Sequence, residues 1–191
     1  MNTCLDSLLR VRELADKLAK AWCYAYSWIL EYCRLEESVI ELCTRLRNAM
    51  DSFMKSRDDY VLGVVPCQII DGGEIVGAVY LSSESGKPPY LLLASYTILD
   101  DTIYAAFTIL HEISHHVGFN SEDLADFIAT TVIDKGTRKS LLEFLEKPPK
   151  TVEQAIKDSI RSGRVCDIRG LEKLLEDKGL IRVYVSKCNS T

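Results

Sequence analysis

The sequence predicts an α+β protein with long N-terminal helices, a small antiparallel sheet of about three strands, a helix that carries three histidines, an antiparallel helix beside it, and a small C-terminal helix–helix–strand unit. Three observations predict this arrangement. Residues 3–57 contain no proline or glycine and place apolar side chains three and four apart, which is helical spacing. Residues 60–95 are rich in Val, Ile, Leu and Tyr and are interrupted by turn residues. After residue 100 the helical spacing returns.

The bulk composition is that of an ordinary folded protein. Hydrophobic residues make up 47% of the 191 residues and charged residues 27%. We divide the chain into an N-terminal helical segment (1–58), a core (59–147) and a C-terminal appendage (148–191). The net charge of −5 argues against a protein that binds nucleic acid through a basic surface, so we do not expect a nucleic-acid partner.

The N-terminal segment is longer than an ordinary globular helix. It therefore forms either one very long helix or a helical hairpin. Aromatic residues lie on more than one of its faces: Trp22, Tyr24, Tyr26, Trp28 and Tyr32. We interpret them as core residues, with a homodimer interface through these helices as the alternative.

No segment of the chain resembles a membrane anchor or a signal peptide. The most apolar run, residues 21–33, contains Glu31 and is shorter than the roughly 20 residues that a spanning helix needs. Residues 1–20 mix charges with leucine, so we expect a cytoplasmic protein with no membrane association. The seven scattered cysteines form no CxxC pair and are expected to be buried and reduced. One or two disulfides are the alternative if the source is a hyperthermophile.

Three apolar segments are expected to be strands: residues 60–70, 74–82 and 90–95. The sequence Asp71-Gly72-Gly73 predicts a tight hairpin between the first two. Proline cannot donate a hydrogen bond to a neighbouring strand, so Pro66 predicts that the first segment is an edge strand or a bulged one.

Helices are expected on both sides of Gly118. Asp101 or Thr102 can cap the first helix, and Gly118 suits the left-handed conformation that ends a helix. Ser121 can cap the second helix, which runs to about Asp134. A short helix over residues 137–145, helices over 151–161 and 167–177 and a strand over 180–186 complete the chain.

All three histidines fall within residues 111–116. Residues four apart share one face of a helix, so His111 and His115 can offer their imidazoles to a single ion. Glu112 lies about 100° further round the helix. From there it cannot easily bind the ion, but it can act as a general base toward a zinc-activated water.

A catalytic zinc usually has three protein ligands. The candidates for the third are Glu122, Asp123 and Asp126. If the chain reverses near Gly118, His115 faces about residue 122 and His111 faces about residue 126. Glu122 has the longer reach and is assigned as the third ligand, while Asp126 is assigned as acceptor for the free N–H of a ligating histidine. Exchange of these two roles is the alternative.

Residues 111–115, followed by Glu122-Asp123-Leu124-Ala125-Asp126, resemble the HExxH…ExxAD pattern of gluzincins. The chain is similar in particular to the ImmA/IrrE family of small intracellular metallopeptidases, over about residues 90–134. The resemblance implies a zinc cofactor held by His111, His115 and Glu122, and a protein or peptide substrate. It also implies that the strand 90–95 binds extended peptide as an added strand. Six residues separate His115 from Glu122, fewer than expected, so Asp126 stays open as the third ligand.

A metzincin pattern competes for the same histidines. Residues 115–121 resemble its HxxGxxH extension, including the glycine. However, Ser121 stands at the third ligand position, and no methionine follows the motif. We therefore reject this assignment.

The sequence offers several donors for a developing oxyanion without choosing among them. They are Tyr90, Tyr96, Tyr104 and His116, each of which has a structural role as the alternative.

The predicted function is that of an intracellular zinc-dependent metallopeptidase with Glu112 as general base. The alternative is a catalytically weak metal-binding module with a regulatory or DNA-associated role, because residues 151–186 resemble part of a winged helix and carry several basic residues.

Overall fold

Two helices joined by a short turn form the N-terminal part of the protein. The structure, a computed structural model, describes residues 3–55, 58–65, 68–71, 74–82, 87–94, 102–139, 165–167 and 180–188. Helix α1 spans Thr3–Leu35, a 3-10 turn η1 spans Glu37–Val39, and helix α2 spans Ile40–Lys55. The hairpin is thus the correct one of the two predicted alternatives. A disulfide between Cys33 and Cys43, here called the turn disulfide, joins the two helices.

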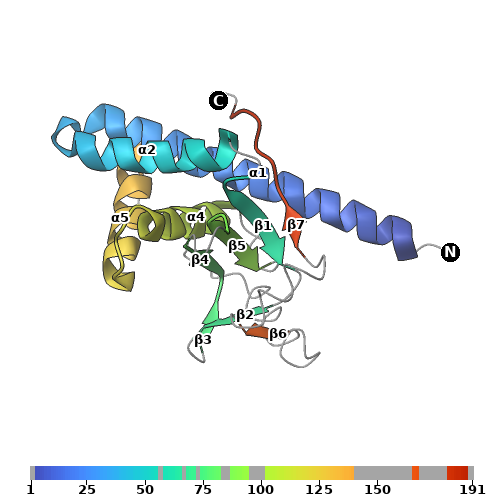
Figure 1. The fold of residues 1–191 in the computed structure, drawn as a ribbon. Coiled ribbons are helices and arrows are strands. Elements are labelled where there is room, and N and C mark those ends of the chain that lie inside the picture. Colours follow the sequence, from blue (N-terminus) through green and yellow to red (C-terminus); the bar gives the residue numbers. More distant parts are fainter. Residues whose placement is uncertain are drawn as a thin grey trace.

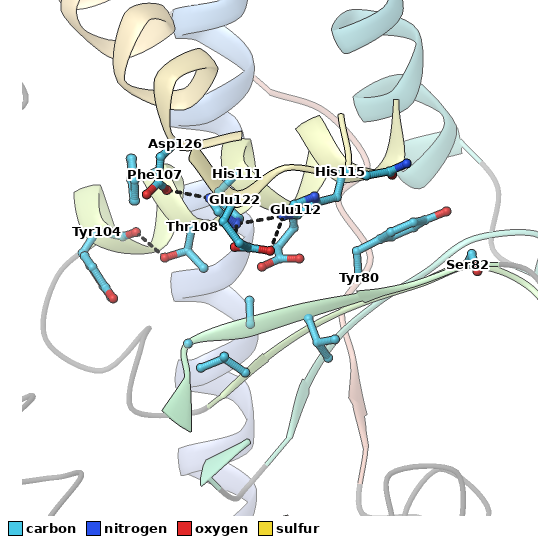
Figure 2. A pocket seen from close by; sticks show the side chains of 15 residues that line it. Tyr80, Ser82, Tyr104, Phe107, Thr108, His111, Glu112, His115, Glu122 and Asp126 are labelled. Atoms are coloured by element: carbon cyan, nitrogen blue, oxygen red, sulfur yellow. Dashed lines mark hydrogen bonds and ion pairs between the residues drawn. The ribbon is translucent and has the colours of Figure 1, made fainter. Parts of the chain in front are cut away.

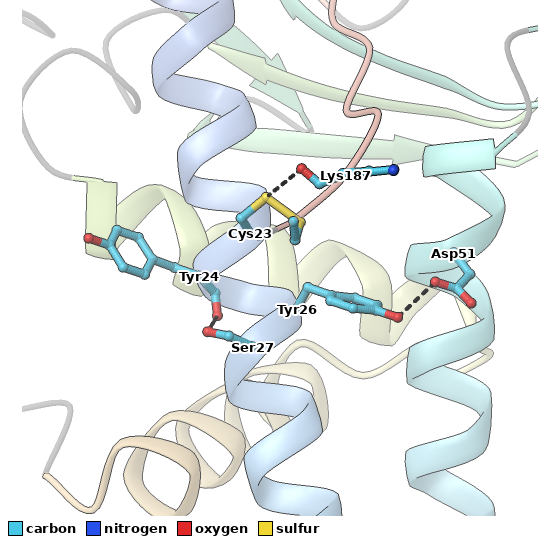
Figure 3. Close-up of a disulfide and its surroundings, with 7 residues drawn as sticks. Cys23, Tyr24, Tyr26, Ser27, Asp51 and Lys187 are labelled. Atoms are coloured by element: carbon cyan, nitrogen blue, oxygen red, sulfur yellow. Dashed lines mark hydrogen bonds between the residues drawn. A yellow bond between two sulfur atoms is a disulfide. The ribbon is translucent and has the colours of Figure 1, made fainter. Parts of the chain in front are cut away.

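One face of α1 supplies much of the hydrophobic core. Leu18, Ala21, Trp22, Ala25 and Ile29 are fully buried, at spacings of three and four residues along the chain, as expected for one side of a helix. This face contacts helices α4 (Thr102–His116) and α5 (Glu122–Thr137). The aromatic residues of the segment pack in or against the same core, which confirms the core interpretation for them. Tyr26 adds a polar link by donating to Asp51 on α2 at 2.9 Å (Figure 3).

The main sheet has four strands in the order β4-β5-β1-β7. The strands are β1 (Val61–Val65), β4 (Ala78–Leu81), β5 (Tyr90–Ala94) and β7 (Ile181–Arg182). Strands β1 and β5 are parallel, and the other pairs are antiparallel. The prediction of a purely antiparallel sheet of about three strands was therefore wrong. The two central strands are nearly continuous apolar runs and are almost entirely buried, which is typical of strands inside a parallel arrangement.

A second sheet has the order β3-β2-β6, from β2 (Gln68–Asp71), β3 (Glu74–Val76) and β6 (Val165–Asp167). Figure 1 shows it on the side away from α1 and α2. Antiparallel pairing of Asp71 with Glu74 confirms the predicted hairpin. The predicted strand 60–70 is instead divided between the two sheets, and Pro66 lies outside the described residues. Because β1 lies between β5 and β7, the edge-strand alternative was wrong for it, while the alternative of a bulge at Pro66 falls outside the described residues.

The C-terminal part contributes strands to both sheets, β6 beside β2 and β7 beside β1. The predicted helices 137–145, 151–161 and 167–177 lie largely outside the described residues, and the three-part domain division stays a prediction. After β7, Val183 and Val185 are buried in the core. A disulfide between Cys23 and Cys188, here called the tail disulfide, joins this segment to α1 (Figure 3).

The cysteines differ from the main expectation, because two disulfides are found among the described residues. Within the described part of the chain, no helix has the length and apolar character needed to cross a bilayer.

Candidate metal centre

Helix α4 presents two different faces. Ala106, Ile109, Leu110 and Ile113 are buried against the core, which fixes the rotation of the helix. His111 and His115 lie one turn apart on the opposite, partly exposed face, as the spacing predicts. The packing of the apolar face therefore directs both imidazoles outward, toward the start of α5.

Three side chains converge at this point (Figure 2). The Nε2 atoms of His111 and His115 are 3.0 Å apart. Glu122 places one carboxylate oxygen 3.0 Å from His111 Nε2 and the other 3.3 Å from His115 Nε2. Together they form a group that could hold a metal ion.

The outer nitrogen of each imidazole has its own acceptor. His111 Nδ1 lies 2.7 Å from an oxygen of Asp126, and His115 Nδ1 lies 2.7 Å from the backbone carbonyl of Phe119. A carbonyl and an ionised carboxylate can only accept, so both Nδ1 atoms carry the proton. In the neutral rings the Nε2 atoms therefore have free lone pairs.

Two imidazole nitrogens and a carboxylate are donor types that also occur in zinc sites. With both rings neutral and protonated at Nδ1, two nitrogen lone pairs and a carboxylate face one another, and a cation at the centre would stabilise this arrangement. A single proton would satisfy only one pair of these atoms. In tetrahedral zinc sites with bonds of 2.0–2.2 Å, neighbouring ligand atoms are about 3.3–3.5 Å apart. The observed separations of 3.0–3.3 Å are close to that value.

The structure distinguishes the positions of the three acids near the motif. Glu122 reaches both inner nitrogens, whereas Asp126 contacts only the outer nitrogen of His111. Asp123 is not part of the described group. Glu122 and Asp126 have side chains that are 78% and 58% exposed, so the carboxylate side of the group is open to solvent. Their assignment as ligand and as orienting acceptor stays a prediction that agrees with this geometry.

Two backbone features bring Glu122 to this place. Gly118 has φ +103, the left-handed conformation that was expected to end the helix. Its N–H donates to His115 O at 2.9 Å, and the N–H of Phe119 donates to Ser114 O at 3.1 Å. Ser121 occupies the cap position of α5, although its side chain makes no capping hydrogen bond. The turn is thus short enough for Glu122, the first residue of α5, to return to His115.

Glu112 lines the same cleft. The cleft has a volume of about 730 Å³ and lies between α4, the start of α5 and strand β4. Glu112 is only 7% exposed, yet it belongs to the lining together with His111, His115 and Glu122. In Figure 2 its carboxylate points toward the space beside the carboxylate of Glu122.

The strand beside the cleft is β4 and not β5. Strand β5, which includes most of the predicted substrate strand 90–95, is paired with β4 on one side and with β1 on the other. No edge of β5 is open to an added peptide, so that prediction was wrong. Strand β4 stands at the end of the sheet, and Ala78, Tyr80 and Ser82 line the cleft.

Of the four predicted oxyanion donors, Tyr104 lines the cleft, and Tyr96 lies outside the described residues. His116 instead packs its ring against Phe53, Tyr60 and Tyr80, and burial lowers its pKa. This places His116 in an aromatic cluster and away from the metal group.

Tyr80 is a cleft residue that the sequence interpretation missed. Burial raises the pKa of its hydroxyl, and Tyr60 raises it further. No alternation marks it in the sequence, because Val79 lines the cleft as well as Ala78 and Tyr80. In Figure 2 the hydroxyl groups of Tyr80 and Tyr104 both point away from the cluster of His111.

Comparisons with protein-family models, with curated proteins and with solved structures found no match to this chain.

Proposed function

We propose that this protein is a zinc-dependent metallopeptidase of the gluzincin type, similar to the ImmA/IrrE family, that hydrolyses peptide bonds. One observation carries the proposal. The inner nitrogens of His111 and His115 and the carboxylate of Glu122 converge in a group that could hold a metal ion, and Glu112 lies beside them in an open cleft. This set combines three metal ligands with a candidate base, which is the combination that hydrolysis requires.

Each residue has a defined task in this proposal. His111, His115 and Glu122 hold the ion, while Asp126 and the Phe119 carbonyl keep the rings in the correct tautomer. When bound, zinc supplies a Lewis acid and lowers the pKa of a water molecule toward about 7. Glu112 would be the base that takes a proton from such a water and the acid that returns it to the leaving amine.

The substrate that fits this cleft is an extended peptide. Strand β4 forms one wall and ends the sheet on that side, so a peptide can align along it as a further strand. Phe107 and Tyr104 line the part of the cleft on the N-terminal side of His111, where they offer an apolar contact to a substrate side chain.

Replacing Glu112 with Gln tests the function. Glu112→Gln keeps the size of the side chain but removes the base, so we expect hydrolysis of an unstructured protein or a peptide library to fall at least about 100-fold. Zinc content should stay at that of the wild type. Glu41→Gln, on the exposed side of α2, is the matched control and should retain full activity.

The outcomes separate the two candidate functions. Hydrolysis that survives in Glu112→Gln would refute the proposed role of this residue. A wild-type protein that binds zinc but cleaves none of the substrates would favour the metal-binding regulatory module instead.

We further propose a cytoplasmic location. Structural disulfides such as the two described here are rare in the cytoplasm of mesophiles but occur in intracellular proteins of hyperthermophiles. The proposal therefore predicts a thermophilic source, and fractionation of the source cells would test the location directly.

A further inference from the structure

Arg45 on helix α2 contacts three consecutive residues of the turn between α4 and α5. Its Nη2 donates a hydrogen bond to the carbonyl of Val117. Its guanidinium carbon lies 5.5 Å from the centre of the Phe119 ring. Between these two residues, the position that a Cβ of Gly118 would occupy is 3.3 Å from Arg45 Nη2. One side chain from the N-terminal hairpin thus contacts the first three residues of the connection between α4 and α5.

The turn that Arg45 contacts also supports the metal group. The Phe119 carbonyl accepts the Nδ1 proton of His115 at 2.7 Å. Two residues further on, Ser121 occupies the position before α5, and Glu122 is the first residue of that helix. A shift of the turn would therefore change the direction of the His115 lone pair and the position of the Glu122 carboxylate together.

We propose that Arg45 is a positioning residue for the metal site. It holds the turn of residues 117–119, and through that turn it orients His115 and places Glu122. The inference rests on the metal site proposed above, but not on its use in peptide hydrolysis.

The chemistry of the contact requires arginine. A planar guanidinium can stack on the Phe119 ring and donate to the Val117 carbonyl at the same time. A lysine ammonium keeps the charge and can still donate a hydrogen bond, but it lacks the planar group that stacks on the ring. The lysine variant should therefore preserve only part of the effect.

Zinc affinity separates positioning from simple stabilisation. If Arg45 only stabilised the fold, its loss would ease unfolding but leave the affinity of the folded protein for zinc unchanged. If Arg45 orients ligands, Arg45→Ala should weaken zinc binding about tenfold, at the low end of the range for residues that orient metal ligands. Competition with a chromophoric chelator measures this affinity in the full-length protein.

Two further variants complete the zinc titration. Arg47→Ala removes an exposed arginine two residues along the same helix and should bind zinc as the wild type does. Arg45→Lys should give an intermediate affinity. An unchanged affinity in Arg45→Ala, or an equal loss in Arg47→Ala, would overturn the proposal.

A second measurement uses the metal-free protein. Nitrogen-15 NMR of the imidazoles at pH 8 should show His115 protonated at Nδ1 in the wild type and a mixture of tautomers in Arg45→Ala, because the Phe119 carbonyl is no longer held in place. A single Nδ1–H tautomer in both proteins would contradict the inference.

Two further outcomes of the zinc titration have a defined interpretation. If Arg45→Ala does not fold, Phe119→Leu removes the stacking partner but keeps the backbone carbonyl, and it should weaken zinc binding in the same direction. Wild-type protein that binds zinc without cleaving peptides would refute the proposed hydrolase alone, whereas wild-type protein that binds no zinc would refute the metal site and the role of Arg45 together.

Discussion

The two acids of α5 can be told apart by their effect on zinc affinity. Glu122 contacts the inner nitrogens of both histidines, whereas Asp126 contacts only the outer nitrogen of His111. Replacing each with alanine should therefore weaken zinc binding to different degrees. The comparison decides between the two assignments that the sequence left open.

The expected loss for Asp126→Ala is the smaller one. The variant removes the acceptor that keeps the His111 proton on Nδ1, so its Nε2 lone pair is no longer reserved for the metal. Removing such a partner typically costs about 10- to 100-fold in affinity, or roughly 1.4–2.7 kcal/mol. Asp126→Asn should lose less, because its amide oxygen can still accept the proton.

Glu122→Ala should cost more, because it removes a negative charge in direct contact with the ion. Even with the full dielectric screening of water, a doubly charged ion and a carboxylate oxygen about 2.1 Å apart attract by about 4 kcal/mol. A water molecule that takes the empty position restores part of this energy. The net loss should then be on the order of 100- to 1,000-fold in affinity.

The assay is a zinc titration of both variants against a chromophoric chelator, with Asp123→Ala as control. Asp123 is an exposed neighbour of Glu122 that lies outside the described group, so its variant should bind zinc normally. The assignment is refuted if Asp126→Ala loses more affinity than Glu122→Ala. Equal losses would mean that both carboxylates bind the ion.

Three more perturbations test the fold that carries the site. Gly136→Ala should destabilise the protein by about 1–2 kcal/mol in urea unfolding, because a Cβ there would stand 2.5 Å from the Trp28 carbonyl oxygen. This over-packing outweighs the gain in helix propensity. A stabilised variant would refute the close approach of α1 and α5. The tail disulfide closes a loop of 165 residues and the turn disulfide one of 10 residues. Loss of the tail disulfide should lower the free energy of unfolding by about 5 kcal/mol, and loss of the turn disulfide by about 3 kcal/mol, as measured with single Cys→Ser variants. Equal effects would contradict the loop-entropy reasoning. Burial raises the pKa of the Asp51 carboxyl, but hydrogen bonds from Lys55 and Tyr26 outweigh it and leave the pKa below its usual range. The stabilisation from Asp51 should thus be present above pH 4 and disappear as the pH falls through that lowered pKa, so the wild type should lose its advantage over Asp51→Asn in acid; a constant difference at all pH values would exclude this origin.

Local patterns in the chain were sufficient for the helical character of residues 3–55, for α4 and α5, and for the histidine pair. The apolar spacing of α1 and α4 sets which faces are buried, and the interval between His111 and His115 is a property of any helix. The position of Gly118 also predicts the end of α4 from its own conformational freedom. These features depend on residues at most a few helical turns apart. They can therefore be predicted from the sequence without knowledge of the tertiary structure.

Pairing between distant strands could not be obtained in this way. Strand β1 lies between β5 and β7, and the end of the sheet next to the cleft is β4. An apolar strand has the same sequence pattern whichever neighbour it takes, so the pattern could not exclude residues 90–95 as the substrate strand. Only the order of strands in space assigns the cleft wall to β4 and brings Tyr80 into it.

The arrangement around the metal group was decided at the same tertiary level. Both carboxylates of α5 lie one turn apart on one helix face, and spacing alone treats them alike. The turn of residues 117–121 determines that Glu122 meets the inner nitrogens while Asp126 meets an outer one. Arg45 is 72 residues away from the turn it contacts, and no local pattern connects it with His115. Sequence periodicity thus determines which side chains share one face of a helix. The packing of separate elements determines which partner each of these side chains contacts.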